Sequence, residues 1–260
     1  MKFQPALGLA LAGVGLLAST GAFAQCATLP GAWGASSVIG TPADGLSATT
    51  ASAMRSTTCG LEVRSNPRPN RRFVQDDTPA NELRYRARYF IDPNSVAFPI
   101  VGLERRSTVL RVQTTSNSTP LGPQPVGFVD QIVMKLERSE TGYRLVGFAR
   151  VGNGTLDNQS PVADVFRWTQ ASVNGVALLD APNVVELEYV LGATGSFKLW
   201  VNANVEGTPT ISTAARDNAS WAGVDQVRLG NVGAGTNLSV ALAPYYVDEF
   251  ESRRQTFIGN

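Results

Sequence analysis

The 260-residue chain contains no histidine, and this absence limits the chemistry that its other polar residues could perform. Without imidazole, a Ser-His-Asp site, a histidine-dependent lyase site and a histidine-bearing metal site are excluded. Glycoside hydrolysis needs only two carboxylates and remains possible. Glu186 and Glu188, like Glu249 and Glu251, are two residues apart, which places each pair on one face of a strand. The alternative for both pairs is a solvated or arginine-paired strand face.

Trp200 is the candidate residue for stacking on a sugar ring, with Lys198 and Asn202 as its polar partners. Phe197 and its apolar neighbours two and four residues later alternate with Trp200. If those apolar residues form core, Trp200 faces outward. Aromatic rings beside polar side chains on an open face are typical of glycan binding. The alternative is a tryptophan that belongs to the core.

Asp248 is the best single candidate for a calcium ligand, with Asp92 or Asp157 supplied from loops. Ca²⁺ prefers hard oxygen ligands, which aspartate provides without histidine. The alternative is that Asp248 accepts hydrogen bonds from the backbone or from arginine. The sequence therefore gives Ca²⁺ as a possible cofactor, with no other cofactor indicated.

Seven arginines between positions 64 and 88 form the main concentration of charge. One interpretation is a site for an anionic partner such as a uronate-bearing polysaccharide. The alternative is a set of cross-strand ion pairs, in which Arg84, Arg86 and Arg88 face Glu249 or Glu251.

The first residues predict export. An apolar run from position 5 to 17 is followed by Ala22-Phe23-Ala24, a cleavage pattern typical of a secretory signal peptide. The run is shorter than the about 20 residues that span a membrane. Cleavage after Ala24 removes Lys2 from 22 basic residues and leaves 21 against 21 acidic ones, so no net charge would attract nucleic acid. In an exported chain, Cys26 and Cys59 predict one disulfide, worth roughly 3–4 kcal/mol in the chain-entropy model.

About ten short strands are expected after position 60, separated by turn residues and without an amphipathic helix. This pattern predicts an all-β fold, a two-sheet antiparallel jelly-roll sandwich. A hairpin is expected from Phe128 to Val151, with Gly142 in its turn. The expected organisation is a signal peptide at 1–24, an N-terminal arm tied by the disulfide at 25–60, and the sandwich at 61–260.

Five segments in order carry a resemblance to a known group of proteins. They are RYRARY at 84–89, VELEY at 185–189, GSFKLWVN at 195–202, VDQVRLG at 224–230 and VDEFESRR at 247–254. Over about residues 83–259, the chain resembles exported bacterial proteins with a concanavalin A-like, laminin G-like lectin/glucanase sandwich. The resemblance implies two curved sheets, with the last strand beside an early one. The chain departs from the group at Asn183, where tryptophan is usual, at Asn202-Ala203, where Asp-Gly is usual, and in lacking the glucanase spacing Glu-x-Asp-x-x-Glu.

These observations predict an exported, non-catalytic module that binds carbohydrate or a surface partner. The alternatives are a structural envelope protein without a sugar site, and a glycoside hydrolase that uses carboxylates alone. The expected partner is a polysaccharide or a cell-surface protein, with no nucleic acid and no membrane span. The location is periplasmic or extracellular.

Overall fold

The computed structural model describes twelve stretches of the chain. They are residues 26, 28–29, 37–42, 45–55, 57–64, 71–99, 106–114, 129–152, 165–167, 175–233, 243–253 and 256–259. The predicted signal peptide and Asp157 lie outside these residues.

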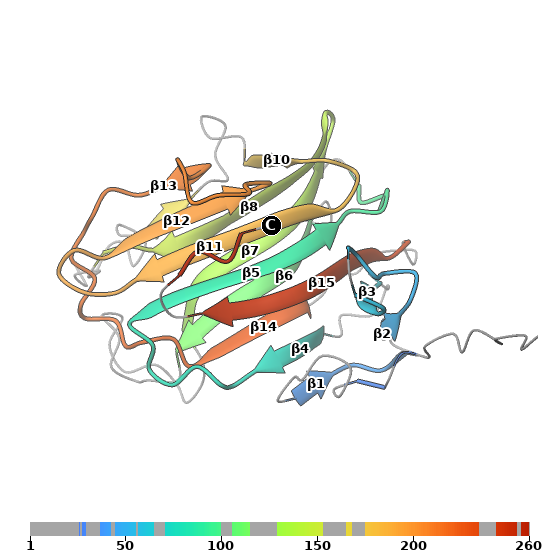
Figure 1. Cartoon of the computed structure of the whole chain (residues 1–260), viewed down its shortest axis with the longest axis horizontal. Helices are drawn as coiled ribbons and strands as arrows, with labels where there is room; N and C mark the ends of the chain where they lie inside the picture. Colours follow the sequence, from blue (N-terminus) through green and yellow to red (C-terminus); the bar gives the residue numbers. More distant parts are fainter. Residues whose placement is uncertain are drawn as a thin grey trace, which may run out of the picture.

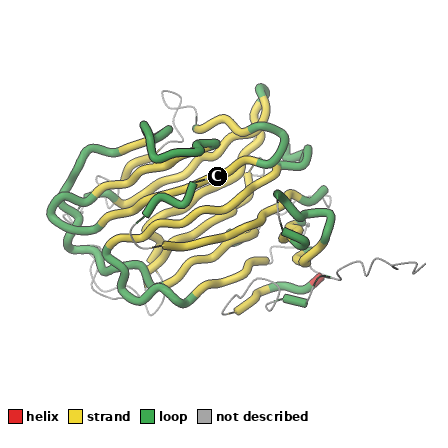
Figure 2. The backbone as a smooth tube through the Cα atoms, in the orientation of Figure 1, coloured by secondary structure: helices red, strands yellow, loops and turns green. Residues whose placement is uncertain are grey.

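The described strands form two antiparallel sheets that face each other, which confirms the predicted sandwich (Figures 1 and 2). We name them sheet A and sheet B. In spatial order, sheet A consists of β1 (Ser37–Ile39), β4 (Arg72–Asp76), β14 (Gln226–Asn231), β6 (Arg106–Thr114), β7 (Val129–Ser139), β8 (Gly142–Arg150) and β10 (Val176–Leu178), with β9 (Val165–Arg167) also paired to β8. Sheet B consists of β13 (Ile211–Ser212), β12 (Ser196–Val201), β11 (Asn183–Val190), β5 (Arg84–Asp92), β15 (Tyr245–Arg253), β3 (Gly60–Val63) and β2 (Leu46–Thr49).

Alternation of side chains along each strand creates one core between the sheets and two outer faces. On β5, Ala87, Tyr89 and Ile91 are fully buried in the core, while the intervening Arg88 and Phe90 point away from it. On β6, Leu110 and Val112 are equally buried, which places Arg111 and Gln113 on the outer face of sheet A. The period of two therefore decides which polar residues share a face.

The last strand, β15, lies between β5 and β3, as the resemblance implied. Its register with β5 shifts between Asp248 and Glu251, where Glu249 has a φ of 46°. Residues 256–259 lie on the outer face of sheet B, where Ile258 and Gly259 bind Glu186 and Arg88. In Figure 1 the C-terminus is marked over β11.

The predicted hairpin is confirmed as β7 and β8, which pair from Ile132 and Ala149 to Ser139 and Gly142. Gly142 has a φ of 122°, a conformation that suits glycine at this turn.

The predicted strand pattern was incomplete. The stretch expected as an arm contributes β1 to sheet A and β2 to sheet B, and β4, β10 and β13 were not predicted. β1, β2, β10 and β13 are two to four residues long, too short for alternation to stand out.

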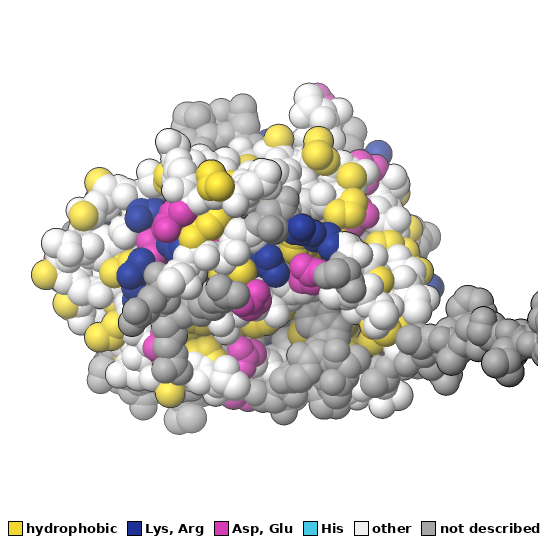
Figure 3. All heavy atoms as spheres, in the orientation of Figure 1, with side chains coloured by type: hydrophobic (Ala, Val, Ile, Leu, Met, Phe, Trp, Pro, Cys, Tyr) yellow, Lys and Arg dark blue, Asp and Glu magenta, His cyan; other side chains and the backbone are white. Residues whose placement is uncertain are grey.

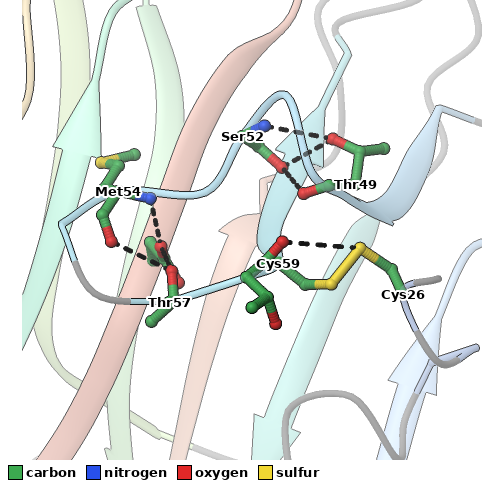
Figure 4. The surroundings of a disulfide bond; sticks show 8 residues. Cys26, Thr49, Ser52, Met54, Thr57 and Cys59 are labelled. Carbon is green, nitrogen blue, oxygen red and sulfur yellow. Dashed lines mark hydrogen bonds between the residues drawn. A yellow bond between two sulfur atoms is a disulfide. The ribbon is translucent and has the colours of Figure 1, made fainter. Parts of the chain in front are cut away.

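A disulfide joins Cys26 to Cys59, with Cα atoms 5.7 Å apart, as expected (Figure 4). It ties the N-terminal region to the residue that precedes β3. A disulfide is typical of exported proteins. Among the described residues, no helix is long and apolar enough to cross a membrane.

Candidate functional site

The outer face of sheet B carries an alternating set of charges that pair with one another. The register of β5 and β11 places Arg86 opposite Glu188 and Arg88 opposite Glu186. Arg88 also lies 3.5 Å from Glu249 and 3.4 Å from Glu251, the cross-strand pairing that the sequence offered as an alternative. Arg84 and Arg86 pair with β11 instead.

Arg86 is the centre of this network and has no exposed surface. Its Nη2 atom lies 2.7 Å from Glu188 and 2.6 Å from Glu206, and its Nη1 atom lies 3.6 Å from Glu186. Burial opposes the charge on Arg86, but the hydrogen bonds and charges of Glu206 and Glu188 outweigh it, so the pKa of the guanidinium is raised. The cation is therefore held permanently among carboxylates.

Glu188 receives three cationic partners. Arg84 lies 2.6 Å away, Arg86 2.7 Å and Lys198 3.1 Å. Burial raises the pKa of Glu188, but these partners more than offset it and hold the pKa at about 2, against an ordinary 4.5. Glu188 is thus a fixed anion and unsuited to proton transfer near neutral pH.

The C-terminal segment covers this network. The amides of Ile258 and Gly259 donate to Glu186 at 2.9 Å, and the carbonyl oxygen of Gly259 accepts from Arg88 at 2.7 Å. Phe257 makes an edge contact with Trp200, and the Arg86 guanidinium lies 5.6 Å from the Phe257 ring centre. Figure 3 shows this face, with basic and acidic side chains intermixed at its centre.

The sequence-predicted sugar platform lies in this covered region. Trp200 points away from the core, but it is only 2% exposed, because Phe257 packs on it, and its Nε1 donates to Gly207. Lys198 is bound to Glu188, and Asn202 accepts from the Val184 amide. Ligand binding by these residues stays a prediction, and the Trp200 ring is not open to a sugar in this structure.

Asp248, the predicted calcium ligand, lies on the same sheet. Its carboxylate accepts hydrogen bonds from the amides of Met54 and Glu249 and from the Thr57 hydroxyl. Met54 and Thr57 lie on the loop that the disulfide anchors (Figure 4). Burial raises the pKa of Asp248 against these hydrogen bonds.

Calcium binding by Asp248 stays a prediction. In the part of the chain that the structure describes, no three or more acidic, cysteine or histidine residues are grouped to hold a metal. Asp92 instead accepts from the Asn94 amide at the end of β5.

The outer face of sheet A differs because like charges lie beside each other. Arg111 on β6 and Arg228 on β14 are paired in register. The Cα atoms of such paired residues are about 5 Å apart, so the two arginine side chains extend from neighbouring positions on the same face. Burial, then the charges of Arg71 and Arg111, lower the pKa of Arg228. Arg111 lies 3.3 Å from Asp130, and its Nε has no hydrogen-bond partner. An anion bound between the two arginines would relieve their repulsion.

Cations outnumber anions on this face. Arg106 and Arg144 share the buried carboxylate of Glu137, at 3.8 Å and 2.5 Å. Arg150 stacks 4.9 Å from the ring centre of Trp221 and donates to the Asp130 carbonyl. The described cations on this face include Arg106, Arg111, Lys135, Arg144, Arg150 and Arg228, and the described anions beside them include Asp77, Asp130 and Glu137. An excess of cations over anions favours an anionic ligand.

Lys135 is the one amine among the described residues of this face. It lies on β7 opposite Thr108 and Val146, two residues along the strand from Val133, which is opposite Arg111. Tyrosine does not supply an alternative base here. Tyr85, Tyr89, Tyr189 and Tyr245 are buried in the core, where burial raises each pKa, Tyr143 donates to the Val96 carbonyl, and Tyr246 lies on sheet B.

Arg111, Arg228 and Lys135 were not among the candidate residues predicted from the sequence. A signal was present in the alternation of β6, where Arg106, Arg111 and Gln113 interleave with buried apolar residues. Two register shifts between β6 and β7 break that alternation. The meeting of Arg111 with Arg228, 117 positions apart in the chain, follows only from the pairing of β6 with β14.

Comparison with known proteins identifies the fold without identifying a family. No protein-family model matches the chain, and no curated protein sequence is similar to it. Among solved structures, an endo-β-1,4-glucuronan lyase from the fungus Trichoderma reesei matches with a TM-score of 0.60 at 12% identity, over 85% of this chain and 92% of that one. The alginate lyase Aly36B matches with a TM-score of 0.51 at 12% identity, over 84% of this chain and 86% of that one.

These neighbours correct the sequence-based prediction of a non-catalytic binding module. The sandwiches that this chain matches are those of polysaccharide lyases, which are catalytic proteins. The prediction rested on an outward-facing Trp200 and on the absence of histidine, and neither feature reveals a fold shared with lyases. The finer assignment to a bacterial lectin/glucanase group stays a prediction.

Proposed function

We propose that this protein is an exported lyase of uronate-bearing polysaccharides and that its substrate binds on the outer face of sheet A. The observation that carries the proposal is the in-register pair Arg111 and Arg228 on a face with excess cations. Arginine binds carboxylates through two parallel hydrogen bonds, and a polyuronate presents one carboxylate per sugar. The shared fold with two polyuronate lyases supports the proposal by analogy.

The chemistry is a β-elimination that needs no histidine. Arg111 and Arg228 neutralise the uronate carboxylate, which stabilises the negative charge that develops when the C5 proton leaves. The Lys135 amine, in its neutral form, accepts that proton. The C5–H electron pair forms the C4=C5 double bond, the C4–O4 bond breaks, and the leaving oxygen takes a proton from the lysine ammonium or from water.

The proposal includes export through the leader at 1–24, with the mature chain meeting its polymer outside the cytoplasm. The Ala22-Phe23-Ala24 pattern and the Cys26–Cys59 disulfide both support export. N-terminal sequencing of the protein recovered from the culture medium or periplasm tests the cleavage after Ala24.

The activity test uses the mature chain with glucuronan and with alginate. Elimination creates a C4=C5 bond conjugated to the carboxylate, so ultraviolet absorbance of the product should increase with time. Arg111→Gln should weaken polymer binding by roughly tenfold or more, because a charged hydrogen bond is worth about 1.5–3 kcal/mol. Lys135→Met should retain binding and lose at least about 100-fold in turnover.

Arg84→Gln is the matched control, because it removes an arginine from the outer face of sheet B. Arg84 is 47% exposed, and Glu188 keeps Arg86 and Lys198 as partners. Folded protein that neither binds nor cleaves any polyuronate would overturn the proposal. If the Arg84 and Arg111 variants lost polymer binding equally, the assignment of the substrate site to sheet A would be wrong.

A further inference from the structure

Arg106, the first residue of β6, is a partly exposed cation on the proposed substrate face that the proposed elimination does not use. Its side chain is 24% exposed, close to the 23% of Arg111. Its Nη1 atom lies 3.8 Å from Glu137, which is too far for a hydrogen bond. Arg144 binds the other oxygen of that carboxylate through two hydrogen bonds, at 2.8 and 2.5 Å. Glu137 is therefore held by Arg144, and Arg106 can bind a second anion from solvent.

A bulge in β6 places Arg106 and Arg111 on the same face. The two arginines are five residues apart, an odd separation that would put them on opposite faces of a regular strand. The register with β7 shifts between Thr108 and Leu110, where two steps along β6 match one step along β7. The extra residue returns both arginines to the outer face of sheet A, where both make their ion pairs.

Lys135, the proposed base, lies between the two arginines along the strand direction. On β7, the residue opposite Arg106 is Glu137, and the residue opposite Arg111 is Val133. Lys135 is midway between these two β7 residues. Four residues of a strand span about 13 Å, so an arginine starts about 6–7 Å to either side of the lysine along the strand.

This arrangement matches the repeat of a polyuronate. A 1,4-linked chain that turns over at each sugar presents the carboxylates of alternate sugars to the same side. The first and third carboxylates are one disaccharide repeat apart, which two flexible arginine side chains that start about 13 Å apart can reach.

We infer that Arg106 is a second carboxylate-binding residue. It binds the uronate two sugars away from the one that Arg111 and Arg228 hold, so the polymer runs along β6 and β7 and a trimer is the shortest oligomer that reaches both positions. This inference rests on the proposed function and specifies the length and direction of the substrate at the same site.

Oligomer length tests the inference. Binding of 1,4-linked glucuronate dimers and trimers would be measured by titration calorimetry in the Lys135→Met background, which keeps the oligomers intact. This parent protein should bind the trimer roughly tenfold more tightly than the dimer, because the trimer adds a charge-assisted hydrogen bond. Adding Arg106→Gln should remove this gain and leave the affinity for the dimer unchanged.

The other arginines provide matched comparisons. Arg111→Gln should weaken the dimer and the trimer by a similar factor, and Arg84→Gln on sheet B should change neither. Arg106→Lys should recover part of the gain, since it restores the charge without the planar guanidinium. The Arg106 variants should fold, because Glu137 keeps Arg144 as a partner, and melting curves check this.

Equal affinities of the parent protein for the dimer and the trimer would overturn the inference, and this measurement depends on no change at Arg106. An undiminished gain for the trimer in folded Arg106→Gln would also overturn it. Failure of the proposed function is distinct, because the parent protein would then bind neither oligomer.

Discussion

The outer faces of the two sheets have similar residues but opposite arrangements of charge. On sheet B, β5 arginines face β11 glutamates, and Arg86 is enclosed by Glu186, Glu188 and Glu206. On sheet A, Arg111 faces Arg228. The charges of the first face pair with one another and are covered by the chain's own C-terminal segment, whereas the second face keeps excess positive charge. The number of arginines on one strand therefore does not set the charge of a sheet face, because the residues on the neighbouring strand can cancel that charge or add to it.

Removal of Arg86 should give the largest change in stability. Arg86→Met leaves the buried carboxylates of Glu186 and Glu188 without their central cation, so the free energy of unfolding should fall by about 3–5 kcal/mol. Arg111→Met, the same change on sheet A, should alter it by less than about 1 kcal/mol, because that side chain is partly exposed and faces a like charge. Urea unfolding followed by circular dichroism measures both.

Equal losses in the Arg86 and Arg111 variants would contradict the comparison, because both faces would then depend on their arginines for stability. Arg86→Lys should recover part of the loss, since it restores the charge without the planar guanidinium.

Acid should weaken sheet B through Glu188. The pKa of Glu188 is about 2 in the folded protein against an ordinary 4.5, so the unfolded chain takes up the proton first as the pH falls. The stabilisation from Glu188 is complete above the unfolded pKa and is lost as the pH falls from about 4.5 toward 2, at about 1.4 kcal/mol per unit of pKa shift.

Urea midpoints measured between pH 2 and 6 test this expectation. Glu188→Gln should be less stable than the wild type at pH 6 and approach it at low pH. A constant difference between the two proteins across this range would show that the ionisation of Glu188 does not contribute.

Among the changes at Arg86, Glu188 and Phe257, loss of the Phe257 ring should have the smallest effect on stability. Phe257→Ala removes the contacts with Trp200 and Arg86, which should cost about 1–2 kcal/mol and shift Trp200 fluorescence toward longer wavelengths as water reaches the ring. Polyuronate binding should stay unchanged, because the segment lies on sheet B. Val205→Ala, at a 72% exposed side chain, is the control. Improved polymer binding by Phe257→Ala would instead locate a glycan site under the C-terminal segment.

The sandwich, the β7–β8 hairpin and the disulfide could be predicted from the amino-acid sequence. Alternation of Tyr85, Ala87, Tyr89 and Ile91 with arginines depends only on the two-residue period of a strand, which is a local property. The same alternation predicted that Trp200 faces away from the core, as it does in the structure.

The contacts of those outward-facing residues depend on how distant parts of the chain pack together. Phe257, 57 residues further along the chain, packs against the outward-facing Trp200 ring. β14 places Arg228 beside Arg111 and Gln226 beside Gln113. Strand order and register are set by packing among segments more than 100 residues apart, and a one-residue slip would exchange the two faces. The alternation of a strand can therefore be recognised from neighbouring residues in the sequence, whereas the candidate site forms only when strands distant in the chain pair with each other.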